Sequence, residues 1–207
     1  MGSVCFIVDT LVTGANLPRH LQSIRGSGIA NDLLPILVTG THPQPRLNDI
    51  EQRYHTYCLI TPALPLGTRL NKAAFTSQAD WLIIAVQKQP IPAHQWGLLY
   101  SQLNTHTLDA LIIGLAQPSL SERILRRVLA NTLLLPSYIA VRQAWFERLG
   151  GFDPDLDNDR AIDDFLQRLH ACPTRLKTYN GHLQSQMSES SPPVLTKVPD
   201  RSCTPRP

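Results

Sequence analysis

The sequence predicts an α/β protein with a mostly parallel central sheet and helices on both faces. Two observations lead to this prediction. Short, continuously apolar runs alternate with segments of helical period, and 207 residues suffice for one sizeable core but not for two comfortable domains. Continuous apolar runs are typical of parallel strands, because helices cover such strands on both faces. Right-handed crossovers should therefore join the strands through helices.

Five apolar runs are the expected strands. In chain order they are Val4–Val8, a run ending at Val38, a run ending at Ile60, Trp81–Val86 and a run beginning at Ala110. We expect the buried sheet to be filled by Ile7, Val8, Ile36, Val38, Ile83, Ile84, Ile112 and Ile113. Trp145 and Phe152 should pack beside a later helix that is rich in carboxylates.

Segments with helix-forming composition lie between these runs. Leu17, Leu21 and Ile24 fall on one face of a first helix, which the Gly26–Gly28 segment ends. Residues 71–79 and 93–103 are two further helices by composition. Ser119 and Glu122 form a capping box before another expected helix.

The domain organisation follows from a change of composition near the C-terminal end. We expect one α/β domain over residues 1–182. Residues 183–207 are rich in serine, proline and polar residues without apolar periodicity, so they cannot bury enough surface to offset their ordering entropy. A disordered tail is predicted there.

Composition and charge argue against several classes of function. The net charge is +3 and the basic residues are scattered, with Arg123, Arg126 and Arg127 on one expected solvated helix face, so no nucleic-acid partner is expected. The four cysteines make no CxxC pair and the seven histidines lack metal-ligand spacing, which argues against structural zinc and favours reduced thiols. The first residues lack a signal peptide's basic region and are too short an apolar stretch for a transmembrane segment. We expect a cytoplasmic protein.

The expected site lies at the carboxyl ends of the strands, where open α/β sheets bind their ligands. The loops after Val8, Val38, Ile60 and Val86 should meet there, and Asp9 is their only carboxylate before Asp49. A magnesium-dependent site would need more hard oxygen ligands than this. The sequence also lacks the phosphate-binding G-x-x-x-x-G-K-[ST] motif and the G-x-S-x-G motif of serine hydrolases.

Three segments in order resemble one known family. Residues 16–24 read NLPRHLQSI, residues 66–86 read LGTRLNKAAFTSQADWLIIAV, and residues 138–156 read YIAVRQAWFERLGGFDPDL. They resemble the family-2 glycosyltransferases of the Rossmann-like GT-A fold, which transfer a sugar from a nucleotide-sugar donor to an acceptor hydroxyl. The resemblance covers about Ser3 to Lys177. It implies a glycan or lipid-linked acceptor and a role in polysaccharide or glycoconjugate synthesis.

The resemblance also implies roles for individual residues. Asp163 or Asp164 would be the catalytic base that deprotonates the acceptor. The acceptor pocket would include Gly150, Gly151, Phe152 and Asp153, since paired glycines let the backbone turn sharply and approach a ligand. Donor binding would involve Asp9, Thr39, Arg69, Asn71 and Lys88.

The residue chemistry alone leaves simpler interpretations open. Gly150 can be the residue that ends a helix over 141–149. Asp163 and Asp164 can be first-turn carboxylates favoured by the helix dipole, and Lys88 can be a solvated loop lysine.

The sequence departs from the family at two places. The family usually has an Asp after the second strand, where this chain has Thr39. The family's D-x-D motif, which holds Mg²⁺ or Mn²⁺, would fall at residues 86–88, which contain no acid. We therefore predict no metal cofactor, with Lys88 and Arg69 supplying positive charge instead.

Two functions follow as expectations. The first is a nucleotide-sugar-dependent transferase, metal-independent, cytoplasmic or peripheral to the inner face of the membrane. The second is a catalytically inactive homologue that acts as a binding or partner subunit. A nucleotidyltransferase ranks last, because it would want a glycine-rich N-terminal loop and a metal carboxylate.

Overall fold

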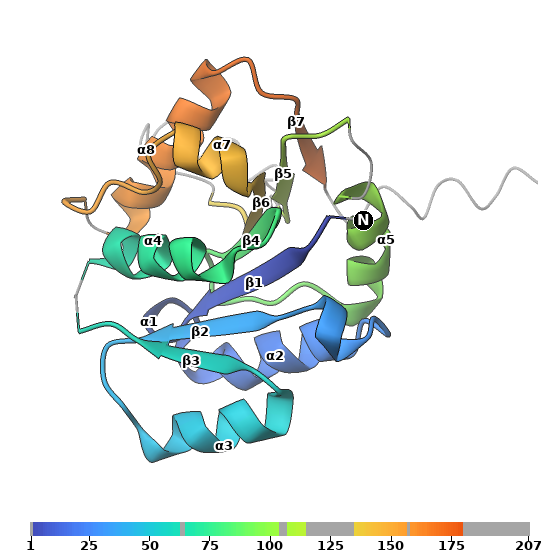
Figure 1. Ribbon diagram of the computed structural model, residues 1–207, viewed down its shortest axis with the longest axis vertical. Coiled ribbons are helices and arrows are strands. Elements are labelled where there is room, and N and C mark those ends of the chain that lie inside the picture. The colour runs from blue at the N-terminus through green and yellow to red at the C-terminus, as the bar shows by residue number, and fades with distance from the viewer. Residues whose placement is uncertain (1, 63–64, 104–106, 115–134, 157, 180–207) are drawn as a thin grey trace, which may run out of the picture.

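The chain folds around one seven-stranded sheet with the strand order β3-β2-β1-β4-β6-β5-β7 (Figure 1). The computed structural model describes residues 2–62, 65–103, 107–114, 135–156 and 158–179. β6 runs antiparallel to its neighbours β4 and β5, while the other neighbouring pairs are parallel. The predicted α/β class with a mostly parallel sheet is confirmed.

The strands are short and mostly buried. They are β1 (Val4–Asp9), β2 (Ile36–Gly40), β3 (Tyr57–Ile60), β4 (Trp81–Ala85), β5 (Ala110–Ile113), β6 (Tyr138–Arg142) and β7 (Leu176–Tyr179). All five expected strands are present. The eight aliphatic residues expected in the sheet are buried, as is Phe152, whereas Trp145 is only half-buried.

The structure corrects the sequence predictions at three strands, β6, β7 and β3. The helix expected over 141–149 begins only at Gln143, because Tyr138–Arg142 is inserted between β4 and β5 and is buried there. β7 was not predicted. β3 is not buried on both faces: it is an edge strand, and Tyr57 is 65% exposed. An edge strand covered on one face has the same apolar composition as a central strand, so the sequence does not distinguish them.

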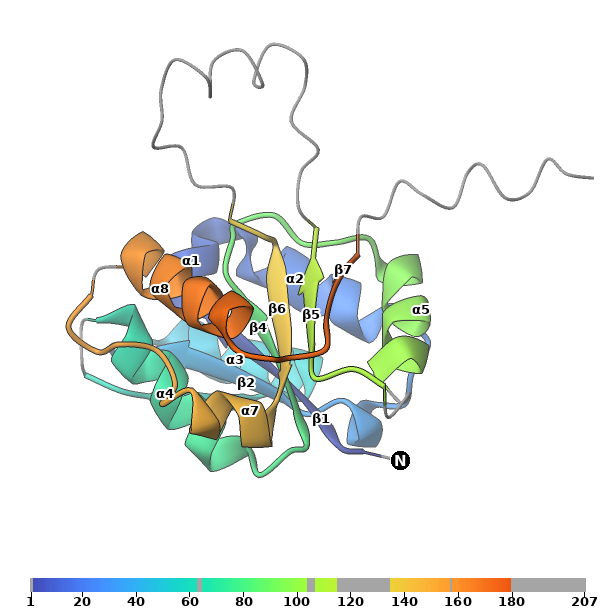
Figure 2. The same ribbon diagram turned by 90° about the horizontal axis from the view of Figure 1, so that it is seen from above.

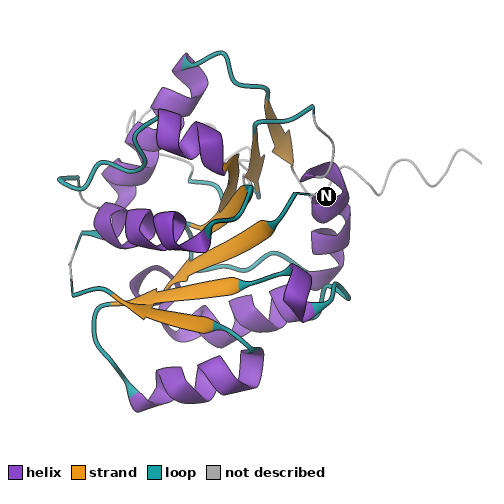
Figure 3. Cartoon of the chain, viewed as in Figure 1, coloured by secondary structure: helices purple, strands orange, loops and turns teal. Residues whose placement is uncertain are grey.

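The helices form one layer on each face of the sheet (Figures 1 and 2). The elements on the first face are α2 (Leu17–Arg25), α3 (Pro45–Tyr54) and α5 (Ala93–Leu103). Those on the second face are α4 (Leu66–Ser77), α7 (Gln143–Arg148) and α8 (Asn158–Ala171). A short α1 (Thr10–Thr13) follows β1, and 3₁₀ turns occupy Gly14–Asn16 and Asn31–Leu33. Figure 3 shows the strands between these helices.

An aromatic cluster occupies the core on each face. On the first face, Trp96 of α5 meets Phe6 and Tyr138 edge-on, at ring-centroid distances of 4.8 and 4.9 Å. On the second face, Phe146, Phe152 and Phe165 pack together at 4.7–5.6 Å. Such contacts add to the free energy of burying the rings. α7, α8 and the segment between them are thereby fixed to the sheet.

Several sequence predictions fall outside the described residues. These are the Ser119–Glu122 capping box with its arginine-bearing helix, and the tail over 183–207. Within the described residues, no helix is long and apolar enough to cross a membrane.

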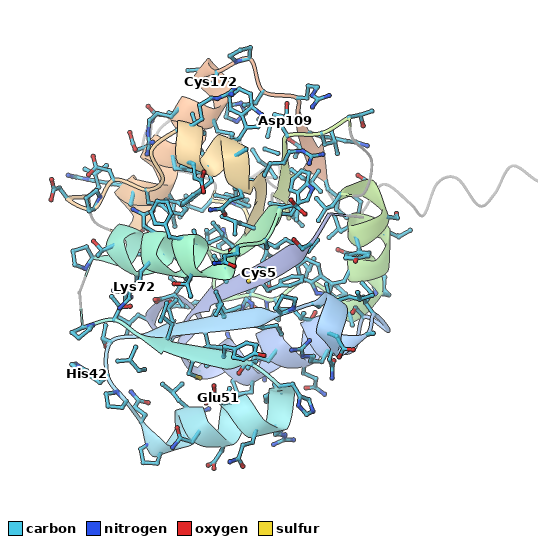
Figure 4. The ribbon with its side chains drawn as sticks, viewed as in Figure 1. Cys5, His42, Glu51, Lys72, Asp109 and Cys172 are labelled. Carbon is cyan, nitrogen blue, oxygen red and sulfur yellow. The ribbon has the colours of Figure 1, made fainter. Side chains whose placement is uncertain are left out.

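A buried carboxylate holds β5 and its two neighbouring strands together at one end of the sheet. Asp109, labelled in Figure 4, precedes β5 and accepts hydrogen bonds from the backbone N of Arg175 at 3.0 Å and from its Nε and Nη2 at 2.9 and 2.8 Å. Arg142 Nε lies 3.9 Å from the same carboxylate. Chiefly through the Arg175 hydrogen bonds, the pKa of Asp109 falls from 3.8 to about 2. This group therefore ties the ends of β5, β6 and β7.

Asp109→Asn should lower the free energy of unfolding by about 1–3 kcal/mol at pH 7, because charge-assisted hydrogen bonds are lost. The pKa is depressed in the folded state, so this stabilisation is complete above about pH 4 and is lost as the pH falls through 3.8 toward 2. Urea unfolding of wild type and variant at pH 7 and pH 3 measures this contribution to the free energy of unfolding. A difference between the two proteins that stays constant over this range would contradict the assignment.

Candidate functional site

An open cavity of about 390 Å³ lies at the carboxyl ends of β1 and β4. Apolar side chains of α1, the start of α4 and Ile162 of α8 line it. Its charged lining residues are Lys88, in the loop after β4, and Asp159, in the first turn of α8. The described part of the lining therefore presents one cation and one carboxylate where the fold class places its ligands.

Three predicted donor-binding residues form a buried cluster with one another. Arg69 Nε donates to Asp9 Oδ2 at 2.7 Å and its Nη2 donates to Asp9 Oδ1 at 3.0 Å. Thr39 Oγ1 also donates to Asp9 Oδ2, at 2.7 Å. All three residues are 0% exposed. The structure thus brings Asp9, Thr39 and Arg69 together, but they face the interior, and their role in donor binding stays a prediction.

Asp9 also begins the next element of the chain. Its Oδ1 accepts hydrogen bonds from the backbone N of Leu11 and Val12, at 2.9 and 3.2 Å, and so caps α1. Both carboxylate oxygens therefore have donors, and Asp9 neutralises the charge of Arg69. The predicted role of Arg69 beside a leaving group would require this pair to open.

Asn71 connects α4 to the Gly-Gly-Phe-Asp segment. Its Nδ2 donates to the carbonyl of Phe152 and its Oδ1 accepts from the N of the same residue, both at 2.8 Å. A Cβ on Gly67 would lie 2.5 Å from the Asp153 carbonyl, so the two backbones are in direct contact. Asn71 thus binds protein backbone in this structure, beside the α4 turn that lines the cavity.

The two glycines are explained by the end of α7. Gly150 N donates to the Glu147 carbonyl at 2.9 Å and Gly151 N donates to the Phe146 carbonyl at 3.0 Å, the two bonds of a Schellman motif. Gly150 and Gly151 have φ of +80° and +71°, a region that residues with a Cβ rarely adopt. Gly150 therefore terminates the helix, as the simpler interpretation of the sequence held.

Neither predicted catalytic base lines the cavity. Asp163 is half-buried and accepts a hydrogen bond from Gln167 Nε2 at 2.6 Å. Asp164 pairs with Arg168 at 2.9 and 2.6 Å, and Nη1 of Arg168 donates to the Leu149 carbonyl. Both lie in the second turn of α8 rather than in its first, so the interpretation as first-turn carboxylates is wrong.

The carboxylate in the cavity is Asp159, which the sequence analysis did not select. It lies four residues before Asp163, hence one turn earlier on the same helix face. The signal that could have identified Asp159 is the start of α8 at Asn158, because the first turn of a helix that follows a site loop lies near the carboxyl edge of the sheet. The acid-rich sequence DNDRAIDD does not fix the residue at which the helix begins, so the sequence alone does not place Asp159 in the first turn.

The Lys88 loop is fixed through its backbone. The Lys88 carbonyl accepts hydrogen bonds from Asn16 Nδ2 at 3.0 Å and from His20 Nε2 at 3.1 Å. Gln87 Nε2 donates to the Leu135 carbonyl. The Lys88 residue is exposed, so its side chain is available to a ligand while its backbone is held.

These residues do not fit the divalent metal that the resemblance implies. Among the described residues, no three His, Cys, Asp or Glu side chains are grouped to hold a metal ion. The described residues that line the cavity include a single carboxylate and a lysine, whereas Mg²⁺ and Mn²⁺ prefer several oxygen ligands.

Arg69→Met should lower the free energy of unfolding by about 3–5 kcal/mol, because it leaves the buried Asp9 carboxylate without its ion pair. Lys72→Met on the exposed side of the same helix is the matched control and should change stability by about 0.5 kcal/mol or less. Figure 4 labels Lys72. Urea denaturation compares the two. Equal effects would show that the Asp9–Arg69 pair does not stabilise the fold.

Gly151→Ala should destabilise the protein more than Gly150→Ala. Both variants incur about 1–2 kcal/mol for a left-handed backbone, but a Cβ on Gly151 would lie 2.6 Å from Asn71 Oδ1, whereas nothing lies within 4 Å of one on Gly150. Disrupting the Asn71 hydrogen bonds should add about 1–3 kcal/mol. The comparison is made by thermal and urea unfolding, and a larger loss for Gly150→Ala would refute the described packing.

Comparisons with known proteins bear on the fold. No protein-family model matches the sequence, and neither does any curated protein. The mannosyltransferase PcManGT from Pyrobaculum calidifontis, in complex with GDP-Man and Mn²⁺, superposes with a TM-score of 0.67 at 17% identity, covering 87% of this chain and 55% of the other. S. aureus TarS 1-349 in complex with UDP-GlcNAc gives 0.65 at 14% identity, covering 86% and 56%.

A cytidylyltransferase from Leptospira borgpetersenii serovar Hardjo-bovis also superposes, with a TM-score of 0.56 at 11% identity over 87% of this chain and 76% of the other. The chain spans a little over half the length of the first two structures. At these identities the superpositions establish architecture. The chain has the GT-A fold of the nucleotide-sugar transferases, as the sequence resemblance implied.

Proposed function

We propose that this chain is a nucleotide-sugar-dependent glycosyltransferase that acts without a divalent metal. The observation that supports it is the cavity at the carboxyl ends of β1 and β4, which Lys88 and Asp159 both line. A cation suits the diphosphate of a donor and a carboxylate suits the proton of an acceptor hydroxyl. The GT-A fold makes a nucleotide-sugar the favoured donor.

Lys88 would stabilise the charge that develops on the leaving diphosphate. As the bond between the anomeric carbon and the diphosphate oxygen breaks, negative charge grows on that oxygen, and a fixed cation stabilises it in the transition state. Arg69 cannot share this role in the described conformation, because it is buried and paired with Asp9. Lys88 is therefore the cation that we assign to the donor.

Asp159 would be the general base. Its carboxylate takes the proton of the acceptor hydroxyl, whose oxygen forms the new bond to the anomeric carbon while the nucleoside diphosphate departs. Asp163 lies one turn further along α8, and Asp164 is engaged with Arg168. We therefore rank Asp159 first as the base and keep Asp163 second.

The acceptor would enter beside residues 150–153. This segment packs against the first turn of α4, where Gly67 touches the Asp153 backbone and the neighbouring Leu66 lines the cavity. A glycan or a lipid-linked sugar would fit the proposed chemistry. With a lipid-linked acceptor the protein would act in the cytoplasm at the inner face of the membrane.

A second candidate is a catalytically inactive homologue that binds a ligand or a protein partner. The observation that favours it is the placement of Asp163 and Asp164 outside the cavity lining, with Arg69 neutralised by Asp9. Such a protein would bind a nucleotide-sugar without turning it over.

Calorimetric titration with UDP, GDP, UDP-GlcNAc and GDP-mannose, in EDTA or in Mn²⁺, tests the proposal. Wild type should bind at least one of them in EDTA, and Lys88→Met should weaken that binding by about tenfold to a hundredfold, as expected for a charge-assisted phosphate contact. Lys72→Met should leave it unchanged. Binding that requires Mn²⁺, or that Lys88→Met does not alter, would refute the metal-free site.

Release of nucleoside diphosphate in the presence of acceptor separates the two candidates. Asp159→Asn should bind the donor normally and lose about a hundredfold or more in turnover, because a general base contributes that much. Donor binding without turnover in wild type would support the inactive homologue. Full turnover by Asp159→Asn would reassign the base.

A further inference from the structure

A buried histidine lies behind the Lys88 loop. His20 of α2 is 0% exposed and has a hydrogen-bond partner at each ring nitrogen. Nδ1 lies 2.5 Å from the hydroxyl of Tyr138, which begins β6, and Nε2 lies 3.1 Å from the carbonyl of Lys88. The imidazole thus connects three segments that are distant in the sequence.

The two partners fix the tautomer of His20. A carbonyl oxygen only accepts, so Nε2 carries the proton and Nδ1 accepts from the Tyr138 hydroxyl. Burial lowers the pKa of His20, although the hydrogen bond to the Lys88 carbonyl opposes this, and burial raises the pKa of Tyr138. A neutral imidazole and a neutral phenol therefore form a polarised chain that ends on the Lys88 backbone.

Two other hydrogen bonds hold the Lys88 loop beside those of His20. Asn16 donates to the same carbonyl, and the N of Val86 donates to the Ser137 carbonyl at 3.0 Å. These bonds hold the two ends of the loop against α2 and β6. His20 is the group that joins both supports, because it contacts the Lys88 carbonyl and Tyr138 at once.

We propose that His20 is a positioning residue for the donor site, which fixes the Lys88 backbone through Nε2 and is itself oriented by Tyr138. The inference rests on the proposed function only where donor affinity is concerned. His20 is buried, so it acts through Lys88 and not on the substrate. Removing it should loosen residues 86–90 and weaken the Lys88 contact with a nucleoside diphosphate.

Four variants separate positioning from general stability. His20→Leu removes both hydrogen bonds, and His20→Gln retains one amide donor for the Lys88 carbonyl and one acceptor for Tyr138. Tyr138→Phe removes only the orienting hydroxyl. Asp109→Asn is the control, since it destabilises the fold from the amino end of β5, while Lys88 follows the carboxyl end of β4.

Amide hydrogen exchange over residues 86–89, above all at the Val86 amide that donates to the Ser137 carbonyl, is the first measurement, and it needs no ligand. Exchange should accelerate about tenfold in His20→Leu, less in Tyr138→Phe, and return toward wild type in His20→Gln. Asp109→Asn should leave the ratio of the exchange rate of this segment to that of the rest of the chain unchanged. Equal acceleration in His20→Leu and Asp109→Asn would overturn the inference.

Titration with UDP and GDP is the second measurement. His20→Leu should weaken binding about tenfold, and His20→Gln should restore it. If wild type binds neither nucleotide, or if Lys88→Met binds as wild type does, the proposed function fails, and the exchange data alone decide whether His20 fixes the loop. If Lys88→Met loses affinity but His20→Leu does not, the positioning role fails while the proposed function stands.

Discussion

The buried ion pair between Asp9 and Arg69 is the constraint on which the site depends. A carboxylate at the end of β1 could be buried only with its oxygens fully hydrogen-bonded. Arg69, Thr39 and the first amides of α1 supply these bonds, so one side chain joins β1, β2, α1 and α4. Two residues after Arg69, Asn71 extends the same attachment to the Phe152 backbone. Two sets of hydrogen bonds from α4 therefore fix the segments that surround the cavity.

These hydrogen bonds determine which side chains remain for a ligand. With Asp9, Arg69 and Asn71 bonded to protein groups, the cavity presents residues from the surrounding loops and helix starts, chiefly Lys88 and Asp159. Lys88 is supported through its backbone and Asp159 through the packing of α8 on the second-face aromatic cluster. Ligand groups held by fixed backbone and packed helices suit a site that must place donor and acceptor accurately.

The sequence predicted the sheet better than the site. Continuous apolar runs located five strands, because packing in the sheet requires that composition, in an edge strand such as β3 as in the central strands. It missed β6, where the helix-forming residues after Arg142 obscured a five-residue strand, and it could not identify β3 as an edge. The sequence assigned Asp9, Thr39 and Arg69 to one donor-binding set, but only side-chain geometry shows that they bond to one another. The resemblance pointed to Asp163 and Asp164, whereas the carboxylate of Asp159, one turn earlier on the same face of α8, lines the cavity, because the sequence does not fix the residue at which this helix begins.

The electrostatics of the cavity explain how a donor could be held without a metal. A diphosphate carries more negative charge than Lys88 alone can balance. Among the described residues, no side chain caps the first turn of α4, where Leu66 lines the cavity, and the amides at a helix N-terminus carry positive partial charge. α1 makes no such contribution, because Asp9 already occupies its amides. In the proposed function, Lys88 would therefore supply the charged contact to the diphosphate, and Asp159 would serve the acceptor.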